Sequence, residues 1–164
     1  MTKTGFTKIV VMALFIFGIS SSAAFAQKRE AEEGEKIKID SIFQKYIVAR
    51  ALKDKDVLVN MFGYDSSQVD NFTDDPLWHY KNYNLKKAIV ENGDGKTKFT
   101  GFYIVSKDGQ DENFVLIVNG DYSDNTSTAW VGPWQYFPYN NESKSYTMQE
   151  AEEELDKWFS IGLK

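Results

Sequence analysis

Residues 114–118, Phe-Val-Leu-Ile-Val, form a run without a polar side chain. Side chains of a strand alternate between its two faces, so this run predicts a strand that is covered on both sides. Aromatic-rich segments with strand-like alternation flank it, and amphipathic helical segments lie further out on both sides. The sequence therefore predicts an α+β domain, in which N-terminal helices and a C-terminal helix pack on an antiparallel sheet of about four to six strands.

The N-terminus is typical of a secretory signal. Lys3 and Lys8 precede an apolar run over residues 9–19, and small residues then lead to Ala24-Phe-Ala26. The alternative is a membrane anchor, but the run is shorter than the roughly 20 residues of a comfortable span. We expect residues 1–26 to be cleaved, the mature protein to be periplasmic or secreted, and no stable membrane anchor to remain. The chain has no cysteine, which excludes lipidation at the cleavage site, disulfides and thiolate metal sites.

Loss of this segment makes the charge balance more acidic. Removing its two lysines from 19 basic residues leaves 17 against 24 acidic ones, a net charge of −7. Nucleic acids and anionic membranes are bound by clustered basic residues, so this balance argues against both as partners. It favours solubility and cationic partners.

The first part of the mature chain predicts helices. We expect residues 27–36 to be a flexible lead-in and residues 37–164 to be a single domain. Apolar residues share one helical face over residues 37–52, namely Ile39, Phe43, Tyr46 and Ile47. Asp54 or Asp56 can cap a second short helix over residues 57–62. Residues 64–75 are rich in Asp, Ser, Asn and Thr, which is typical of a loop.

Turn residues divide the middle of the chain into strands. Asn92-Gly-Asp-Gly95 is typical of a hairpin, and further turns are expected at residues 107–109 and 120–125. Gly132-Pro133 is expected to separate the last two strands, and Pro138 indicates that the last is an edge strand or ends there. The strands then cover residues 77–90, 99–105, 113–119, 126–130 and 134–139.

The C-terminal helix is marked at its beginning and its end. Thr147 and Glu150 fit a capping box, and Gly162 can end the helix. One apolar stripe follows from helical spacing: Met148, Ala151, Leu155, Trp158 and Phe159. We interpret the acidic residues 152–154 as a solvated helix face near the positive end of the helix dipole.

No residue pattern supports catalysis. His79 is the only histidine, and no nucleophile or oxyanion donor is specified beside it. A single histidine and the absence of cysteine argue against a zinc or iron site. Asp121, Asp124 and Asn125 lack the glycine and distal glutamate of a calcium loop. We therefore expect a non-enzymatic protein without a metal site or a cofactor.

An aromatic motif occurs twice. Residues 78–84 and 134–140 both read W-x-Y-x-x-Y-N, and Trp130 has the same parity as Trp134. The motif has two interpretations, core packing between strands or an exposed platform for a sugar or a protein partner. The second interpretation predicts a binding surface made of Trp78, Tyr80, Tyr83, Trp130, Trp134, Tyr136 and Tyr139.

Two protein families share local features with this chain. The helix over residues 57–63, the loop after it, Trp78-His-Tyr80 and the hairpin over residues 102–110 resemble the helix–helix–sheet module of β-lactamase inhibitor protein and of small outer-membrane-assembly lipoproteins. This resemblance implies an exported protein-binding domain, although the lipid-bearing cysteine of the lipoproteins is absent. The same helix also resembles the second helix of the nuclear transport factor two-like cone fold, through Asp54, Leu58, Phe62 and Asp65, which implies a curved sheet around a pocket. Each resemblance covers well under half of the mature chain, and neither transfers a functional residue.

These features favour an exported binding protein that recognises a protein partner in an inhibitor-like or immunity-like role, through the aromatic surface. The alternative is a domain that binds a carbohydrate or small ligand through the same aromatics or a sheet-lined pocket. A cone-fold enzyme that uses His79 with an aspartate is the most distant hypothesis.

Overall fold

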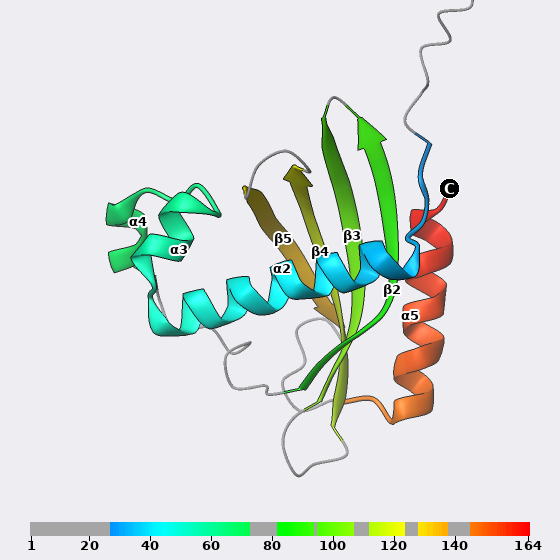
Figure 1. Ribbon diagram of the computed structural model, residues 1–164. Coiled ribbons are helices and arrows are strands. Elements are labelled where there is room, and N and C mark those ends of the chain that lie inside the picture. The colour runs from blue at the N-terminus through cyan, green and yellow to red at the C-terminus, as the bar shows by residue number, and fades with distance from the viewer. Residues whose placement is uncertain (1–26, 73–81, 94, 107–111, 124–127, 138–144) are drawn as a thin grey trace, which may run out of the picture.

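The protein is an α+β domain built on an open antiparallel sheet (Figure 1). The computed structural model describes residues 27–72, 82–93, 95–106, 112–123, 128–137 and 145–164. Five strands lie in the order of the sequence, and neighbours in that order are hydrogen-bonded. This confirms the predicted fold class. The strands are β1 (Arg29–Glu30), β2 (Asn82–Gly93), β3 (Lys96–Ser106), β4 (Asn113–Ser123) and β5 (Ala129–Phe137).

Helices cover both faces of this sheet. Helix α2 (Glu33–Leu52) crosses one face and α5 (Met148–Gly162) packs on the other (Figure 1). In β4, Leu116 and Val118 belong to the core under α2, whereas Val115 and Ile117 belong to the core under α5. The strand predicted to be covered on both sides is therefore confirmed. Its apolar run separates two cores instead of contributing to one.

The expected lead-in forms regular structure. Arg29 and Glu30 pair with Val90 and Ile89 of β2, and α2 begins at Glu33 with a capping box between Glu32 and Glu35. A flexible lead-in over residues 27–36 is therefore not what the structure shows. The charged residues that indicated a frayed segment instead stabilise the helix N-terminus, because the positive end of the helix dipole favours carboxylates there.

Two short helices follow α2. Helix α3 (Lys55–Asn60) begins two residues before the predicted range. Of the two predicted caps it uses Asp54, whose carboxylate accepts a hydrogen bond from the Val57 amide at 3.1 Å. Helix α4 (Ser66–Asp70) lies in the segment expected to be a loop. Its capping box, with Asp65 and Gln68, explains why five polar-rich residues still form a helical turn. The Ala129 amide donates to the Met61 carbonyl at 2.9 Å, which ties this region to the start of β5.

The last two predicted strands are one strand. β4 continues to Ser123, through the expected turn at residues 120–123, and β5 runs through Gly132-Pro133. Val118 pairs with Trp134 and Gly120 pairs with Val131, so β5 has one extra residue in a β-bulge. Gly132 has φ +140°, a conformation that glycine can adopt. Gly132-Pro133 therefore forms a bulge within one strand and not a break between two.

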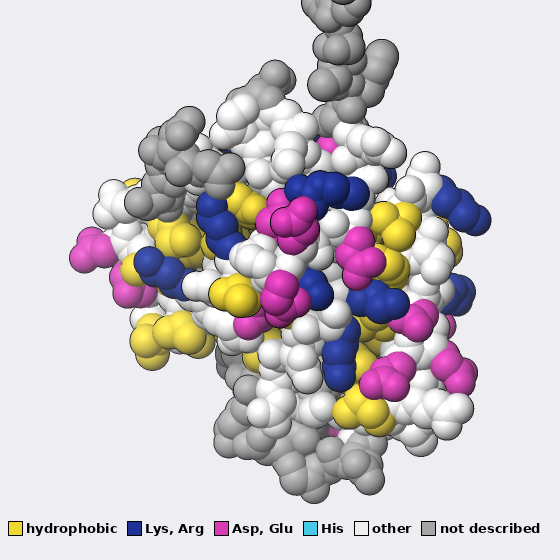
Figure 2. All heavy atoms as spheres, turned by 45° about the vertical axis from the view of Figure 1, so that its right-hand side comes forward, with side chains coloured by type: hydrophobic (Ala, Val, Ile, Leu, Met, Phe, Trp, Pro, Cys, Tyr) yellow, Lys and Arg dark blue, Asp and Glu magenta, His cyan; other side chains and the backbone are white. Residues whose placement is uncertain are grey.

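Helix α5 confirms the predicted capping box of Thr147 and Glu150. Ala151, Leu155 and Phe159 are buried, but Met148 remains 46% exposed, so the buried stripe begins one turn later than predicted. Ion pairs also join α5 to β2, with Lys87 Nζ 2.8 Å from the Asp156 carboxylate. Figure 2 shows this side of the molecule, where basic and acidic side chains alternate around hydrophobic ones.

Candidate binding sites

A hollow lies between α2 and the outer side of β2, and it is larger than the hollow beside Trp130. We call it the α2–β2 groove. Its volume is about 650 Å³, and it is lined by Glu33, Lys36, Ile37, Asp40, Gln44, Asn82, Tyr83, Asn84, Leu85 and Lys86. The helical residues repeat at intervals of three or four and so share one face of α2. The strand residues come from the first half of β2.

This half of β2 is an edge of the sheet. The two-residue strand β1 pairs with β2 only at Ile89 and Val90, beyond a β-bulge between Leu85 and Lys87. Among the residues that the structure describes, no strand pairs with residues 84–87 on the side away from β3. A strand edge presents backbone donors and acceptors in a row, so this edge is chemically suited to receive another extended chain.

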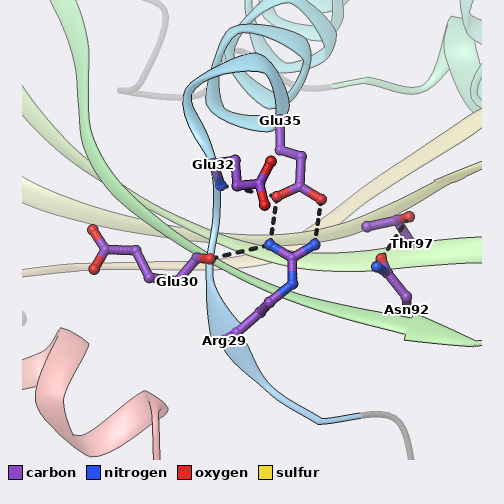
Figure 3. A network of polar contacts seen from close by, with 6 residues as sticks. All are labelled: Arg29, Glu30, Glu32, Glu35, Asn92 and Thr97. Atoms are coloured by element: carbon purple, nitrogen blue, oxygen red, sulfur yellow. Dashed lines mark hydrogen bonds and ion pairs between the residues drawn. The ribbon is translucent and has the colours of Figure 1, made fainter. Parts of the chain in front are cut away.

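A bidentate ion pair holds β1 against the start of α2, at the end of the groove (Figure 3). The Arg29 guanidinium donates to both carboxylate oxygens of Glu35 at 2.7 Å, and the Glu32 amide donates to the same carboxylate at 2.9 Å. The hydrogen bonds from Arg29 lower the pKa of Glu35, against a smaller opposing effect of its burial. In return they raise the pKa of Arg29. The network fixes where α2 begins relative to the sheet.

Polar groups of α2 reach β2 within the groove. Gln44 Nε2 lies 3.4 Å from the Tyr83 carbonyl oxygen and donates to it. The Tyr83 ring packs edge-to-face on Phe43, with ring centroids 5.8 Å apart, so this predicted site residue is partly a core residue. The helix thus positions Tyr83 from behind while the groove leaves part of it accessible.

Tyr103 is an unusual residue behind the groove. It lies on β3 opposite Leu85 and is completely buried, and its hydroxyl has no hydrogen-bond partner among the described residues. Burial raises the pKa of Tyr103 far above its ordinary value. The Asp40 carboxylate, which lies near the hydroxyl but outside hydrogen-bond geometry, raises it further. An unpaired buried hydroxyl costs free energy, and Asp40 is the groove residue that lies near it.

A second hollow lies on the face of the sheet that α5 covers in part. We call it the Trp130 hollow. It has a volume of about 270 Å³ and is lined by Lys28, Ile89, Val90, Glu91, Lys98, Phe99, Thr100, Asn119, Gly120, Asp121 and Trp130. Trp130 is 46% exposed. The Thr100 hydroxyl donates to the Asn119 side-chain oxygen at 2.9 Å, and Lys96 Nζ lies 3.2 Å from the Asp121 carboxylate.

The predicted aromatic residues do not come together as one surface among the described side chains. Tyr83 lies in the groove and Trp130 in the hollow, on opposite faces of the sheet. Trp134 lies opposite Val118 and Trp130 opposite Asp121, so the β5 bulge also assigns these two strand positions to opposite faces. Tyr136 is on β5 opposite Leu116. Trp78, Tyr80 and Tyr139, like His79, lie outside the described residues.

Sequence reasoning missed the helical side of the groove. Lys36, Asp40 and Gln44 stand four residues apart on α2, beside its buried face. The sequence shows this spacing as a polar stripe, but the same pattern is expected for a helix face that is simply solvated. Tyr103 could not be recognised as a residue of interest from the sequence, because an aromatic residue in an apolar strand is expected to be an ordinary core residue.

Comparisons with known proteins identify no relative. The chain matches no protein-family model, no curated protein and no solved structure among those with which it was compared. Within the described ranges, no group of three or more His, Cys, Asp or Glu residues could hold a metal ion. The described helices include none that is both long and apolar enough to span a membrane.

Proposed function

We propose that this chain is an exported, non-enzymatic binding protein that captures an extended segment of a protein partner in the α2–β2 groove. The observation that carries the proposal is the edge of β2 at residues 84–87, which has no strand beside it among the described residues and borders the larger hollow. An added strand gains affinity from backbone hydrogen bonds, and side-chain pockets beside the edge add specificity.

The side chains of the groove favour a polar segment, because the lining holds both acidic residues, Glu33 and Asp40, and basic ones, Lys36 and Lys86. Asp40 lines the groove close to the buried Tyr103 hydroxyl, and Glu33 lies further along the same helix face. The mature chain would be strongly acidic, which favours association with cationic partners. A lysine or arginine of the partner would pair with the Asp40 carboxylate, which lines the groove. An inhibitor-like or immunity-like role against an exported hydrolase or toxin fits such capture.

The proposal is tested by selecting displayed peptides of random sequence against the protein and mapping where the selected peptides bind. We expect peptides rich in Lys or Arg, and slower hydrogen exchange at the amides of residues 84–87 when they bind. Asp40→Ala and Gln44→Ala should each weaken binding about tenfold, the effect of losing a hydrogen bond to a charged group. Gln149→Ala, on the exposed side of α5, is the matched control and should have no effect. Protection of another segment, or selected peptides indifferent to both groove variants, would contradict the proposal.

A further inference from the structure

The Trp130 hollow has the chemistry of a separate ligand site. The strand register places the residues of this region in two rows across the sheet. The first row contains Glu91, Lys98, Asp121 and Trp130, from β2, β3, β4 and β5. The next row towards α5 contains Ile89, Thr100 and Asn119. Both rows lie on the α5 face of the sheet. Helix α5 ends beside them, because a Cβ on Gly162 would lie 2.7 Å from the Ile89 side chain. The last row therefore extends past the helix that covers the rest of this face.

The Trp130 indole lies beside the β5 bulge where it borders the hollow. A Cβ built on Gly132 would lie 3.7 Å from the Trp130 Cζ2 atom, so the indole lies near the bulge of β5. Almost half of its surface is nevertheless exposed. A tryptophan side chain has only two rotatable bonds, so it loses little conformational freedom when a flat ligand stacks on its exposed face.

The hollow combines this aromatic group with closely spaced hydrogen-bonding side chains. Thr100 and Asn119 are already joined by their hydrogen bond, and Asp121 is oriented by Lys96. The lining contains two basic residues, Lys28 and Lys98, and two acidic ones, Glu91 and Asp121. This balance gives no net attraction for an anion or a cation. It suits a ligand that is uncharged and has many hydroxyl groups.

We infer that the Trp130 hollow binds one sugar ring of a neutral oligosaccharide. The ring would stack on Trp130, and its hydroxyl groups would reach the carboxylate of Asp121 and the polar side chains of Thr100 and Asn119. The volume of about 270 Å³ is below the approximately 300–1,000 Å³ of sites for drug-sized ligands, which fits a single sugar ring in a longer glycan. This site shares no lining residue with the α2–β2 groove.

The test is calorimetry of the protein against neutral hexasaccharides (cello-, xylo-, manno- and chitohexaose) and one anionic hexauronate. We expect at least one neutral hexasaccharide to bind. Trp130→Ala should weaken that binding about tenfold or more, as loss of an aromatic stacking partner does. Met148→Ala is the matched control, because Met148 is equally exposed at 46%, and it should bind like the unaltered protein. Asp121→Asn, which preserves the shape of the side chain, should weaken binding several-fold and guards against a folding defect in Trp130→Ala.

Three outcomes would overturn the inference: no binding to any neutral hexasaccharide, a preference for the hexauronate, or binding that Trp130→Ala leaves unchanged. Asp40→Ala should leave sugar binding unchanged while it weakens peptide capture. The two sites can therefore fail independently.

Discussion

Two tyrosines of the α2 core differ in the environment of their hydroxyl groups. Both are almost fully buried, but the Tyr46 hydroxyl lies 2.8 Å from that of Tyr64, whereas the Tyr103 hydroxyl has no partner among the described residues. The same polar atom therefore stabilises the fold at one position and opposes it at the other.

Replacing each tyrosine with phenylalanine should change stability in opposite directions. Tyr103→Phe should raise the free energy of unfolding by about 1 kcal/mol, because an unpaired buried hydroxyl is removed. Tyr46→Phe is the matched control and should lower it by about 1 kcal/mol, because a hydrogen bond is lost. Urea denaturation measures both. If Tyr103→Phe destabilised the protein as much as Tyr46→Phe, the Tyr103 hydroxyl would have to be hydrogen-bonded in solution.

Glu35 makes stability depend on pH. Its pKa is lowered in the folded protein from an ordinary value of 4.5, so the pair with Arg29 adds stability above that pH. The contribution is lost as the pH falls through the lower, folded-state value. Because the Arg29 side chain is 40% exposed, we expect Glu35→Gln to cost about 1 kcal/mol or less at pH 7.

Urea denaturation at a series of pH values checks this expectation. The difference between Glu35→Gln and the unaltered protein should shrink towards zero in acid. Glu33→Gln is a suitable control, because that carboxylate is 78% exposed in its pair with Lys36 and should have little effect at any pH. A cost of Glu35→Gln that persists in acid would show that the ion pair is not its source.

Two β-bulges determine which side chains face the two candidate sites. The β2 bulge at residue 86 lies in the groove, and the β5 bulge at Gly132-Pro133 lies beside the Trp130 hollow. Each inserts one residue and so exchanges the faces of the side chains beyond it. Both candidate sites therefore depend on a local departure from regular pairing.

Gly132 should be intolerant of a side chain. At φ +140° an alanine is strained, so Gly132→Ala should lower the free energy of unfolding by about 1–3 kcal/mol. Gly34 is the matched control, because it lies in the first turn of α2 with nothing within 4 Å of an added Cβ. Gly34→Ala should raise the free energy of unfolding by about 0.5 kcal/mol. Thermal unfolding of both variants measures the contrast, and equal effects would argue against strain at the bulge.

Prediction from the sequence succeeded where one local signal dominated. The apolar run of β4, the Asp54 cap and the Thr147 capping box each specify their element without help from the rest of the chain. The bulge at Gly132 is different, because a Gly-Pro pair is compatible both with a break between two strands and with a bulge inside one strand. Only the pairing partner across the sheet decides between them. The predicted aromatic row depended on that register, and so the sequence alone could not place Trp130.

The sheet has two separate cores, and the core under α5 depends on a single helix. Ala151, Leu155 and Phe159 cover Phe102, Ile104 and Ile117. We expect a chain that ends at residue 146 to expose this apolar face, to bind a hydrophobic dye and to self-associate. A chain that ends at residue 162 keeps all of α5 and should behave as the full protein does. Light scattering and dye fluorescence distinguish the two, and a monomeric, dye-negative short chain would contradict the expectation.

The opposite chain positions of α2 and α5 have a consequence for the order of synthesis. The residues of the core under α2 all precede residue 132, so that core can form without α5. The other face of the same sheet has to wait for the final helix. During that interval a newly formed sheet would present an uncovered apolar surface to other nascent chains. We therefore expect this protein to associate with other chains most readily after the sheet has formed and before α5 has docked on it.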